Sequence, residues 1–176
     1  MKTQVWAHRG ASAYAPENTL EAFRLAAEMG ADGVELDVQL SRDGKLVVAH
    51  DETIDRVSNG TGYIKDYTLA QLKKLSFNRL FPDFKDARIP TLKEVYELLK
   101  PAGLTVNVEL KTGIILYPEI EEKVLALTAS MGMEDRVIYS SFCHPSLVRL
   151  KELDSGLKTG LLYSDGWIDA AAYGRH

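Results

Sequence analysis

The sequence is poor in cysteine and has no long apolar stretch. Cys143 is the one cysteine among 176 residues, so an internal disulfide is excluded. No apolar run approaches the roughly 20 residues that a membrane-spanning helix needs. No apolar signal region follows Met1 either. We therefore expect a cytoplasmic protein in a reducing setting, with no stable membrane anchor.

Positive charge is also scarce. Lys and Arg together number 21 against 25 Asp and Glu, which gives a formal net charge of −4. A broad nucleic-acid-binding face is therefore not expected. A small anionic substrate is still compatible with this balance, provided that a few Arg and Lys side chains gather at one point. The hydrophobic content of 45% is enough for one domain, residues 1–176, with a substantial core.

Strand-like stretches alternate with helix-like stretches along the chain. Strands are expected near residues 5, 35, 107, 139 and 160. Asn18 and Thr91 are read as helix caps, and Pro101 is expected to end the second of these helices. Strands that alternate with helices through short loops are typical of βα units and a parallel sheet.

Residues 52–88 interrupt this alternation. We interpret them as a small insertion after His50, with one short helix capped by Thr68. Aromatic and leucine side chains from residue 77 to residue 84 predict a small apolar cluster under its loop. A last helix is expected from Trp167 onward.

The stretch from Gly33 to Asp51 organises the rest of the chain. Apolar residues alternate there with Glu35 and Asp37, and this period of two is typical of a strand with one polar face. Asp43-Gly44 predicts a two-residue type I′ hairpin turn. Counting back from that turn places Asp37 opposite His50, on the same face. The alternative is a solvated edge hairpin whose charges are only its wet face.

Two of the predicted strands keep a polar face, Glu35-x-Asp37 and Glu109-x-Lys111. Helices cover the outside of an α/β barrel, so a polar face must point inward, where it is costly unless it binds something. We therefore expect Glu35, Asp37 and Glu109 to converge. Two carboxylates about 4 Å apart repel by roughly 4 kcal/mol at an effective dielectric constant of about 20, so three need a cation or a shared proton. All-oxygen ligands suit Mg²⁺ or Ca²⁺.

Two histidines and two cations complete the predicted site. His8 and His50 are free to act as general acid and general base. Arg9 offers a planar fork to phosphate oxygens and Lys111 offers a point charge. Each residue alone has a plainer explanation, because a lone histidine is more often structural and a lone carboxylate pair more often solvated. Their combination at successive strand ends favours phosphoryl chemistry on a small anion.

Four neighbouring side chains receive lesser roles. Glu17 and Asn18 are expected to support the site from behind. His144, just before a proline, is interpreted as a helix-entry residue. Cys143 is interpreted as a packing residue, since no histidine is placed by the sequence to activate it.

Several motifs together closely resemble the glycerophosphodiester phosphodiesterase family, in order from residue 8 to about residue 163. The motifs that carry the resemblance are His8-Arg9-Gly10, Ala15-Pro16-Glu17-Asn18-Thr19, Glu35-Leu36-Asp37-Val38, Asp43-Gly44, His50-Asp51, Asn59-Gly60-x-Gly62, Ile89-Pro90-Thr91-Leu92 and Glu109-Leu110-Lys111.

The resemblance implies a TIM barrel of the phospholipase-C-like phosphodiesterase type, with the insertion after His50. It implies metal-dependent hydrolysis of glycerophosphodiesters to glycerol 3-phosphate and an alcohol. It also implies that the three acidic residues named above hold the metal and that His8 and His50 form the acid/base pair. Arg9 and Lys111 would bind the phosphate.

The chain departs from the family at its C-terminal end. A closed barrel needs eight strands, and about five are predicted here, so the barrel is expected to be incomplete. Two open sheet edges would then be available for self-association. Two alternatives stay open. One is a phospholipase C- or sphingomyelinase-D-like phosphodiesterase, although the sequence shows no apolar rim for a lipid. The other is an inactive metal-binding fragment.

Overall fold

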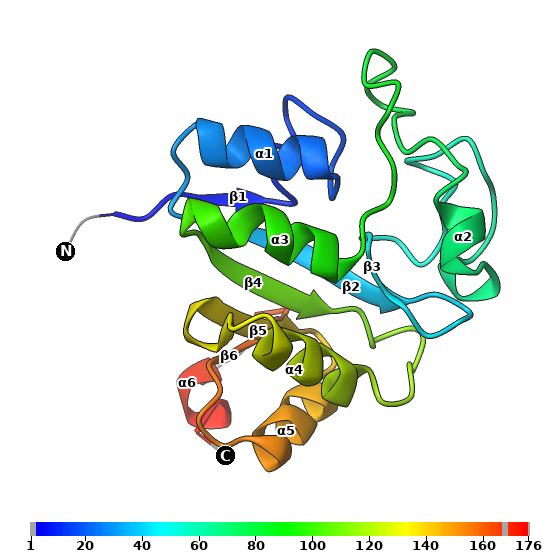
Figure 1. Cartoon of the computed structure of the whole chain (residues 1–176). Coiled ribbons are helices and arrows are strands. Elements are labelled where there is room, and N and C mark those ends of the chain that lie inside the picture. Colours follow the sequence, from blue (N-terminus) through cyan, green and yellow to red (C-terminus); the bar gives the residue numbers. More distant parts are fainter. Residues whose placement is uncertain (1–2, 167–168, 176) are drawn as a thin grey trace.

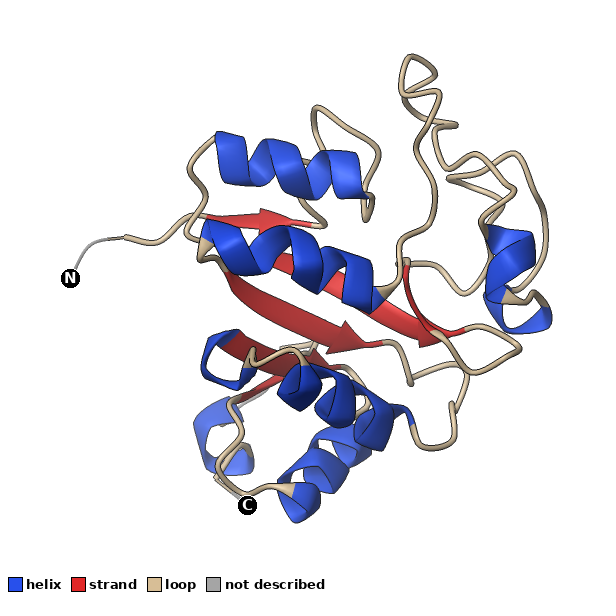
Figure 2. Ribbon diagram, viewed as in Figure 1, coloured by secondary structure: helices blue, strands red, loops and turns tan. Residues whose placement is uncertain are grey.

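A computed structural model of the chain describes residues 3–166 and 169–175 (Figure 1). Within these ranges, five parallel strands form one open sheet, and β3 pairs antiparallel with β2 (Figure 2). The order across the parallel part is β1-β2-β4-β5-β6. The strands are β1 (Trp6–His8), β2 (Gly33–Leu40), β3 (Leu46–Val48), β4 (Thr105–Leu110), β5 (Val137–Ser141) and β6 (Thr159–Leu161).

Helices connect the parallel strands, as the alternating pattern predicts. They are α1 (Leu20–Glu28), α3 (Leu92–Ala102), α4 (Ile120–Ser130) and α5 (His144–Leu153), and the short α6 (Ala170–Tyr173) follows β6. The predicted cap of α3 is confirmed, because Thr91 and Glu94 form a reciprocal capping box. Pro101 does not end α3 as predicted, and the helix continues to Ala102. Gly103 ends the helix, because its φ of 74° is a left-handed conformation that glycine adopts freely.

The alternation in β2 separates the two faces of the sheet. Val34, Leu36 and Val38 are fully buried in the main core, together with the inner sides of α1, α3 and α4. Because successive side chains in a strand point to opposite faces, Glu35 and Asp37 project from the face that these helices do not cover. The structure therefore has the inside and outside of a barrel wall, with the polar positions on the inside.

The sheet is open within the described residues. There, β1 pairs only with β2, and β6 pairs only with β5. This agrees with the prediction of about five barrel strands. The helix predicted from Trp167 begins outside the described residues, and α6 covers four residues of that stretch. Among the described residues, no helix has both the length and the apolar character needed to span a membrane.

Residues 52–88 fold around an apolar cluster of their own. Ile54, Ile64, Leu72 and Phe77 are buried there against residues next to β3 and α3. The segment carries the 3₁₀ turn η1 (Ile64–Asp66) and the helix α2 (Leu69–Leu72), and it lies beside the end of β2 in Figure 1. The predicted cap of α2 at Thr68 is confirmed.

The aromatic part of the insertion differs from the prediction. Phe77 is buried, but Leu80 is 54% exposed. Phe81 and Phe84 pack edge to face on each other, with ring centroids 6.2 Å apart. The predicted cluster of residues 77–84 therefore contributes one buried side chain and a separate aromatic pair.

The predicted two-residue hairpin turn is wrong. The Ser41 N–H donates to the Lys45 carbonyl at 3.0 Å, so the loop between β2 and β3 has three residues. Its third residue, Gly44, has a φ of 69°. A type I turn followed by a left-handed residue is the usual three-residue hairpin loop. Ser41 stabilises it, because its hydroxyl donates to Asp43 Oδ1 at 2.7 Å and accepts from the Lys45 N–H at 3.0 Å.

The extra loop residue shifts the hairpin register by one. Ala49, not His50, therefore lies opposite Asp37, and its N–H donates to the Asp37 carbonyl at 3.0 Å. The predicted pairing of Asp37 with His50 is wrong. His50 reaches the site from beyond the end of β3.

Asn18 does not cap α1 as predicted. Thr19 is the cap, and its side chain accepts from the Ala22 N–H. Asn18 has a φ of 57°, a left-handed conformation that asparagine tolerates better than most residues. This backbone turn aims the Asn18 side chain at the sheet.

Candidate active site

Three carboxylates converge on the inner face of the sheet. Asp37 and Glu109 are register partners on β2 and β4, and Glu35 lies two residues before Asp37. One oxygen from each of the three lies within 4.8 Å of the others. Asp37 is fully buried and Glu109 nearly so. The predicted convergence is therefore present, because parallel pairing brings equivalent positions of two strands side by side.

The three carboxylates are buried close together, so a neighbouring positive charge would stabilise their ionised forms. Burial, then the neighbouring Asp37 charge, raises the pKa of Glu35 from 4.5 to about 8. Burial and Asp37 also raise the pKa of Glu109. Glu35 Oε1 and Asp37 Oδ1 are buried without a hydrogen-bond partner among the described residues. Unpaired buried oxygens and a purely oxygen donor set fit a hard divalent cation such as Mg²⁺ or Ca²⁺.

Two cationic side chains lie directly against the carboxylates. Lys111 Nζ is 3.0 Å from Glu109 Oε1 and 3.9 Å from Asp37 Oδ1. Arg9 Nε is 3.7 Å from Asp37 Oδ2, and the Arg9 backbone N–H donates to Glu35 Oε2 at 3.0 Å. Arg9 has a φ of 58°, so this contact depends on a left-handed backbone at the end of β1. Both predicted phosphate-binding residues thus lie at the acidic group.

The two histidines approach the carboxylates from different strands. His8 ends β1 as the register partner of Glu35, and its Nε2 is 3.7 Å from Glu35 Oε2. His50 follows β3, and its Nδ1 is 2.6 Å from Asp51 Oδ1. Burial and Asp37 dominate the pKa of Glu109, while Lys111 and, more weakly, His50 act to lower it. His8 is therefore next to Glu35, and His50 is held by Asp51 just beyond the end of β3.

Glu17 and Asn18 both contact predicted site residues. Asn18 Nδ2 donates to Asp37 Oδ2 at 2.8 Å in the buried interior. Glu17 Oε1 accepts from Arg9 Nη1 at 3.0 Å. Both residues lie on the loop between β1 and α1, so this loop orients one carboxylate and one cation of the group.

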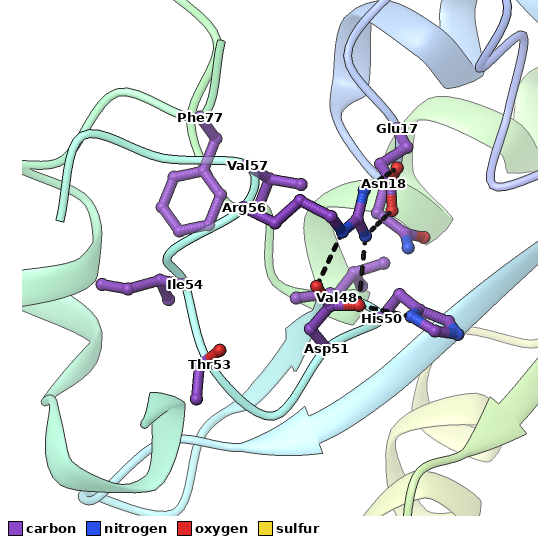
Figure 3. A pocket seen from close by; sticks show the side chains of 11 residues that line it. Glu17, Asn18, Val48, His50, Asp51, Thr53, Ile54, Arg56, Val57 and Phe77 are labelled. Atoms are coloured by element: carbon purple, nitrogen blue, oxygen red, sulfur yellow. Dashed lines mark hydrogen bonds and ion pairs between the residues drawn. The ribbon is translucent and has the colours of Figure 1, made fainter. Parts of the chain in front are cut away.

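Sequence reasoning missed Arg56, which lies in the insertion. Its guanidinium donates to both Glu17 oxygens at 2.7 Å, and to the Asp51 oxygens at 2.7 Å and 3.1 Å (Figure 3). These contacts line a small cavity between the insertion and the barrel wall. A single arginine in a loop segment has no periodicity that would single it out.

Gln39 was also missed, although its position carries a signal. It continues the inward series Glu35-x-Asp37-x-Gln39 and is fully buried. Its Nε2 contacts three backbone carbonyls in the segment that follows β3, those of residues 49, 50 and 51, at 2.9, 3.3 and 2.7 Å. Its Oε1 accepts from the Tyr117 hydroxyl at 2.9 Å. Gln39 therefore fixes the backbone that carries His50.

Exposed apolar side chains lie on the loops that follow the strands. Ile114 and Leu116, after β4, are 76% and 79% exposed. Tyr14 after β1 and Phe142 after β5 are also largely exposed. The expectation that the chain has no apolar rim stays a prediction, because these side chains come from three separate loops. They follow no periodic pattern, so the sequence did not single them out.

Known proteins share this chain's sequence pattern over almost its whole length. A model of the glycerophosphoryl diester phosphodiesterase family matches residues 8–173. A protein named glycerophosphodiester phosphodiesterase, from Caldanaerobacter subterraneus subsp. tengcongensis, is 53% identical over 170 residues, which are 96% of this chain and 70% of that protein.

Solved structures share the fold. A glycerophosphodiester phosphodiesterase from Agrobacterium tumefaciens has a TM-score of 0.82 and 37% identity, covering 90% of this chain and 66% of that one. An Oleispira antarctica phosphodiesterase, in complex with the product sn-glycerol-3-phosphate, has a TM-score of 0.83 and 34% identity, covering 98% of this chain and 70% of that one. This chain thus spans about two thirds of the length of these proteins.

Proposed function

Because the chain belongs to the glycerophosphoryl diester phosphodiesterase family, we propose that it hydrolyses glycerophosphodiesters to glycerol 3-phosphate and an alcohol, using a divalent cation. The observation that carries this proposal is the buried group of three carboxylates, with His8 beside Glu35 and His50 held by Asp51 just beyond β3. Such a group has little structural value unless a cation compensates it. A phosphodiester brings negative charge to the same place and needs proton transfer at two oxygens.

Glu35, Asp37 and Glu109 would hold the cation, either Mg²⁺ or Ca²⁺. When bound, the cation supplies positive charge for the carboxylates and for the phosphate oxygens of the substrate. Arg9 and Lys111 would add charge at the phosphate, since each already lies beside the acidic group. Arg9 would act from a fixed orientation, because Glu17 holds its Nη1.

His8 and His50 would divide the proton transfers. Asp51 accepts a hydrogen bond from His50 Nδ1 in the tautomer that leaves Nε2 as the reactive nitrogen. His8 Nε2 faces Glu35, and most of the ring is accessible. One histidine would activate the nucleophile and the other would protonate the leaving oxygen. The nucleophile would be water or the substrate's own glycerol hydroxyl, which would form a cyclic phosphate that water then opens.

A second candidate function is hydrolysis of a diester with an apolar group, such as a lysophospholipid. The specific observation is the exposed pair Ile114 and Leu116 on the loop after β4. These side chains lie at the end of the sheet where the strand-following loops gather. The acyl chain of such a substrate would pack on Ile114 and Leu116. A choline or ethanolamine group would leave these two side chains without contact.

Release of glycerol 3-phosphate from glycerophosphocholine, with Mg²⁺ or Ca²⁺, tests the main proposal. The chain with Glu109→Gln is the inactive comparison, and Glu97→Gln, on the exposed face of α3, is the matched control. Greater turnover of lysophosphatidylcholine, lost in Ile114→Ser/Leu116→Ser, would favour the second candidate. Metal binding without turnover of either substrate would instead identify a metal-binding fragment.

Self-association is also proposed for this chain. Within the described residues β1 and β6 each leave one edge unpaired. Unpaired strand edges present rows of backbone donors and acceptors that another chain can pair with. Sedimentation velocity over a range of concentrations tests this, and a monomer at every concentration would contradict it.

A further inference from the structure

Arg56 joins two parts of the chain that the sheet does not connect. Glu17 lies on the loop after β1, and Asp51 lies after β3. Arg56 reaches both from residues 52–88 and makes four hydrogen bonds of 2.7 to 3.1 Å with their carboxylates. A guanidinium presents its donors in a rigid planar fork, so it fixes the orientation of each carboxylate as well as its charge.

The Asp51 side of this junction leads to His50. Hydrogen bonding from Arg56 is the largest cause that lowers the pKa of Asp51 to about 2, and the hydrogen bond to His50 acts in the same direction against burial. Asp51 is therefore an anion and an acceptor throughout the neutral range. An anionic acceptor 2.6 Å from His50 Nδ1 keeps the proton on that nitrogen and sets the plane of the ring.

The Glu17 side leads to Arg9. Glu17 accepts from both Arg56 and Arg9, and the pKa of Glu17 is lowered by these two guanidiniums against the effect of burial. Hydrogen bonds and ion pairs thus form a continuous path of contacts. The path runs through His50, Asp51, Arg56, Glu17 and Arg9.

Arg56 itself is carried by a folded element. Ile54 and Phe77 on either side of it belong to the buried cluster of the insertion, and Figure 3 shows Arg56 extending past Val57 from this cluster towards Glu17 and Asp51. Its Nε and both terminal nitrogens are already engaged by these carboxylates. Arg56 therefore acts on carboxylates and is not available as a phosphate ligand.

We propose that Arg56 is a positioning residue, through which the insertion holds His50, by way of Asp51, and Arg9, by way of Glu17, in their working orientations. This inference rests on the proposed role of His50. It assigns the insertion a function in the reaction, because the two side chains it aligns come from separate loops. Loss of Arg56 would free Asp51 and allow the His50 ring to rotate.

The experiment compares Arg56→Met with Arg88→Met in the whole chain. Both variants remove a guanidinium from the insertion, but Arg88 donates to the backbone carbonyls of Lys85 and Ala87, away from the site. We expect kcat to fall about 10- to 100-fold in Arg56→Met, as for other groups that orient a reacting side chain, with a much smaller change in divalent-metal affinity. Arg88→Met should match the unmodified chain.

Nuclear magnetic resonance of ¹⁵N-labelled histidine gives a readout that does not depend on turnover. The unmodified chain should show a slowly exchanging His50 Nδ1 proton, which Arg56→Met loses and Arg88→Met keeps. Arg56→Lys keeps the positive charge but lacks the planar fork of donors. Its His50 Nδ1 proton should therefore exchange faster than in Arg88→Met and more slowly than in Arg56→Met. This comparison remains valid even if the unmodified chain has no diesterase activity, in which case the proposed function fails separately.

Two results would overturn the inference. One is Arg56→Met with unchanged kcat and an unchanged His50 proton. The other is a loss of kcat that follows the loss of folded protein in thermal unfolding, with the His50 proton intact in the folded fraction. The second result would make Arg56 a stabilising residue only.

Discussion

Asn18 donates its side-chain N–H to Oδ2 of Asp37 at 2.8 Å, and Asp37 Oδ1 has no hydrogen-bond partner among the described residues. One oxygen of the carboxylate is thus fixed, while the other would be open to the proposed cation. The left-handed backbone at Asn18, with a φ of 57°, makes this contact possible.

Asn18→Ala should therefore weaken divalent-metal binding by about 10- to 100-fold, since the Asp37 carboxylate loses the group that orients it. It should also lower the free energy of unfolding by about 1–3 kcal/mol, because a buried acceptor loses its partner. Calorimetric titration and chemical denaturation measure the two effects. Asn78→Ala, which removes a hydrogen bond in the insertion, is the control and should leave metal affinity unchanged.

Glu109→Gln should weaken metal binding and reduce diester hydrolysis together. The change keeps the shape of the side chain and removes one negative charge from the group of three carboxylates. Without added metal, the variant should be at least as stable as the unmodified chain, because carboxylate repulsion is relieved. Unchanged metal affinity in calorimetry would show that Glu109 is not a ligand. Glu97→Gln should behave as the unmodified chain.

Metal binding should release protons and strengthen as pH rises. Glu35, with a pKa raised by burial to about 8, is protonated at neutral pH without a cation and must lose that proton to bind one. Affinity should increase from pH 6 towards pH 8 and then level off. Calorimetry at one pH, in buffers of different ionisation enthalpy, counts the protons released. A count of zero at pH 7 would contradict the raised pKa.

The raised pKa of Glu35 also determines the direction in which this residue's contribution to folding stability changes with pH. The pKa of Glu35 is higher in the folded chain than its ordinary value of 4.5, so folding favours the protonated form. This contribution is fully present below 4.5 and is lost as pH rises towards about 8 in the absence of a cation. Saturating Mg²⁺ or Ca²⁺ should remove the loss, and thermal unfolding with and without metal measures it.

His8→Ala and His50→Ala should each lower kcat by about 10²- to 10⁴-fold, the usual contribution of a general acid or base. Metal affinity should change far less, because neither ring belongs to the group of carboxylates. His144→Ala, at the start of α5, is the matched control. Nearly full activity in either of the first two variants would refute the pairing of the two histidines.

Gln39→Leu should destabilise the chain by about 2–4 kcal/mol, because a buried network loses both its donor and its acceptor. Tyr117→Phe removes one hydrogen bond of the same network and should cost about 1 kcal/mol. Chemical denaturation of both variants measures the two losses of stability, and Gln39→Leu should show the larger one. In Gln39→Leu, kcat should fall as well, since the segment that carries His50 is released from β2. An equal loss of stability in both variants would contradict a central role for Gln39.

The sequence by itself determined the parallel βα order, the inward polar face and the identity of the three converging carboxylates. These follow from local rules: a period of two along each strand, capping boxes such as Thr91 with Glu94, and the equivalence of positions in paired parallel strands. The residues also suggested roles for the two histidines and two cations, and the resemblance to a known family implied the same roles and a substrate class.

Only the tertiary structure decided how His50 is held. One extra loop residue moved Ala49 into the place expected for His50, and the Ser41 hydroxyl stabilises this loop through Asp43 within it and the Lys45 N–H after it. Arg56 acts through contacts with Glu17 and Asp51 that span 39 and 5 residues of sequence. Hydrogen bonds over such separations depend on where the insertion packs, and no periodic pattern in the chain encodes that packing.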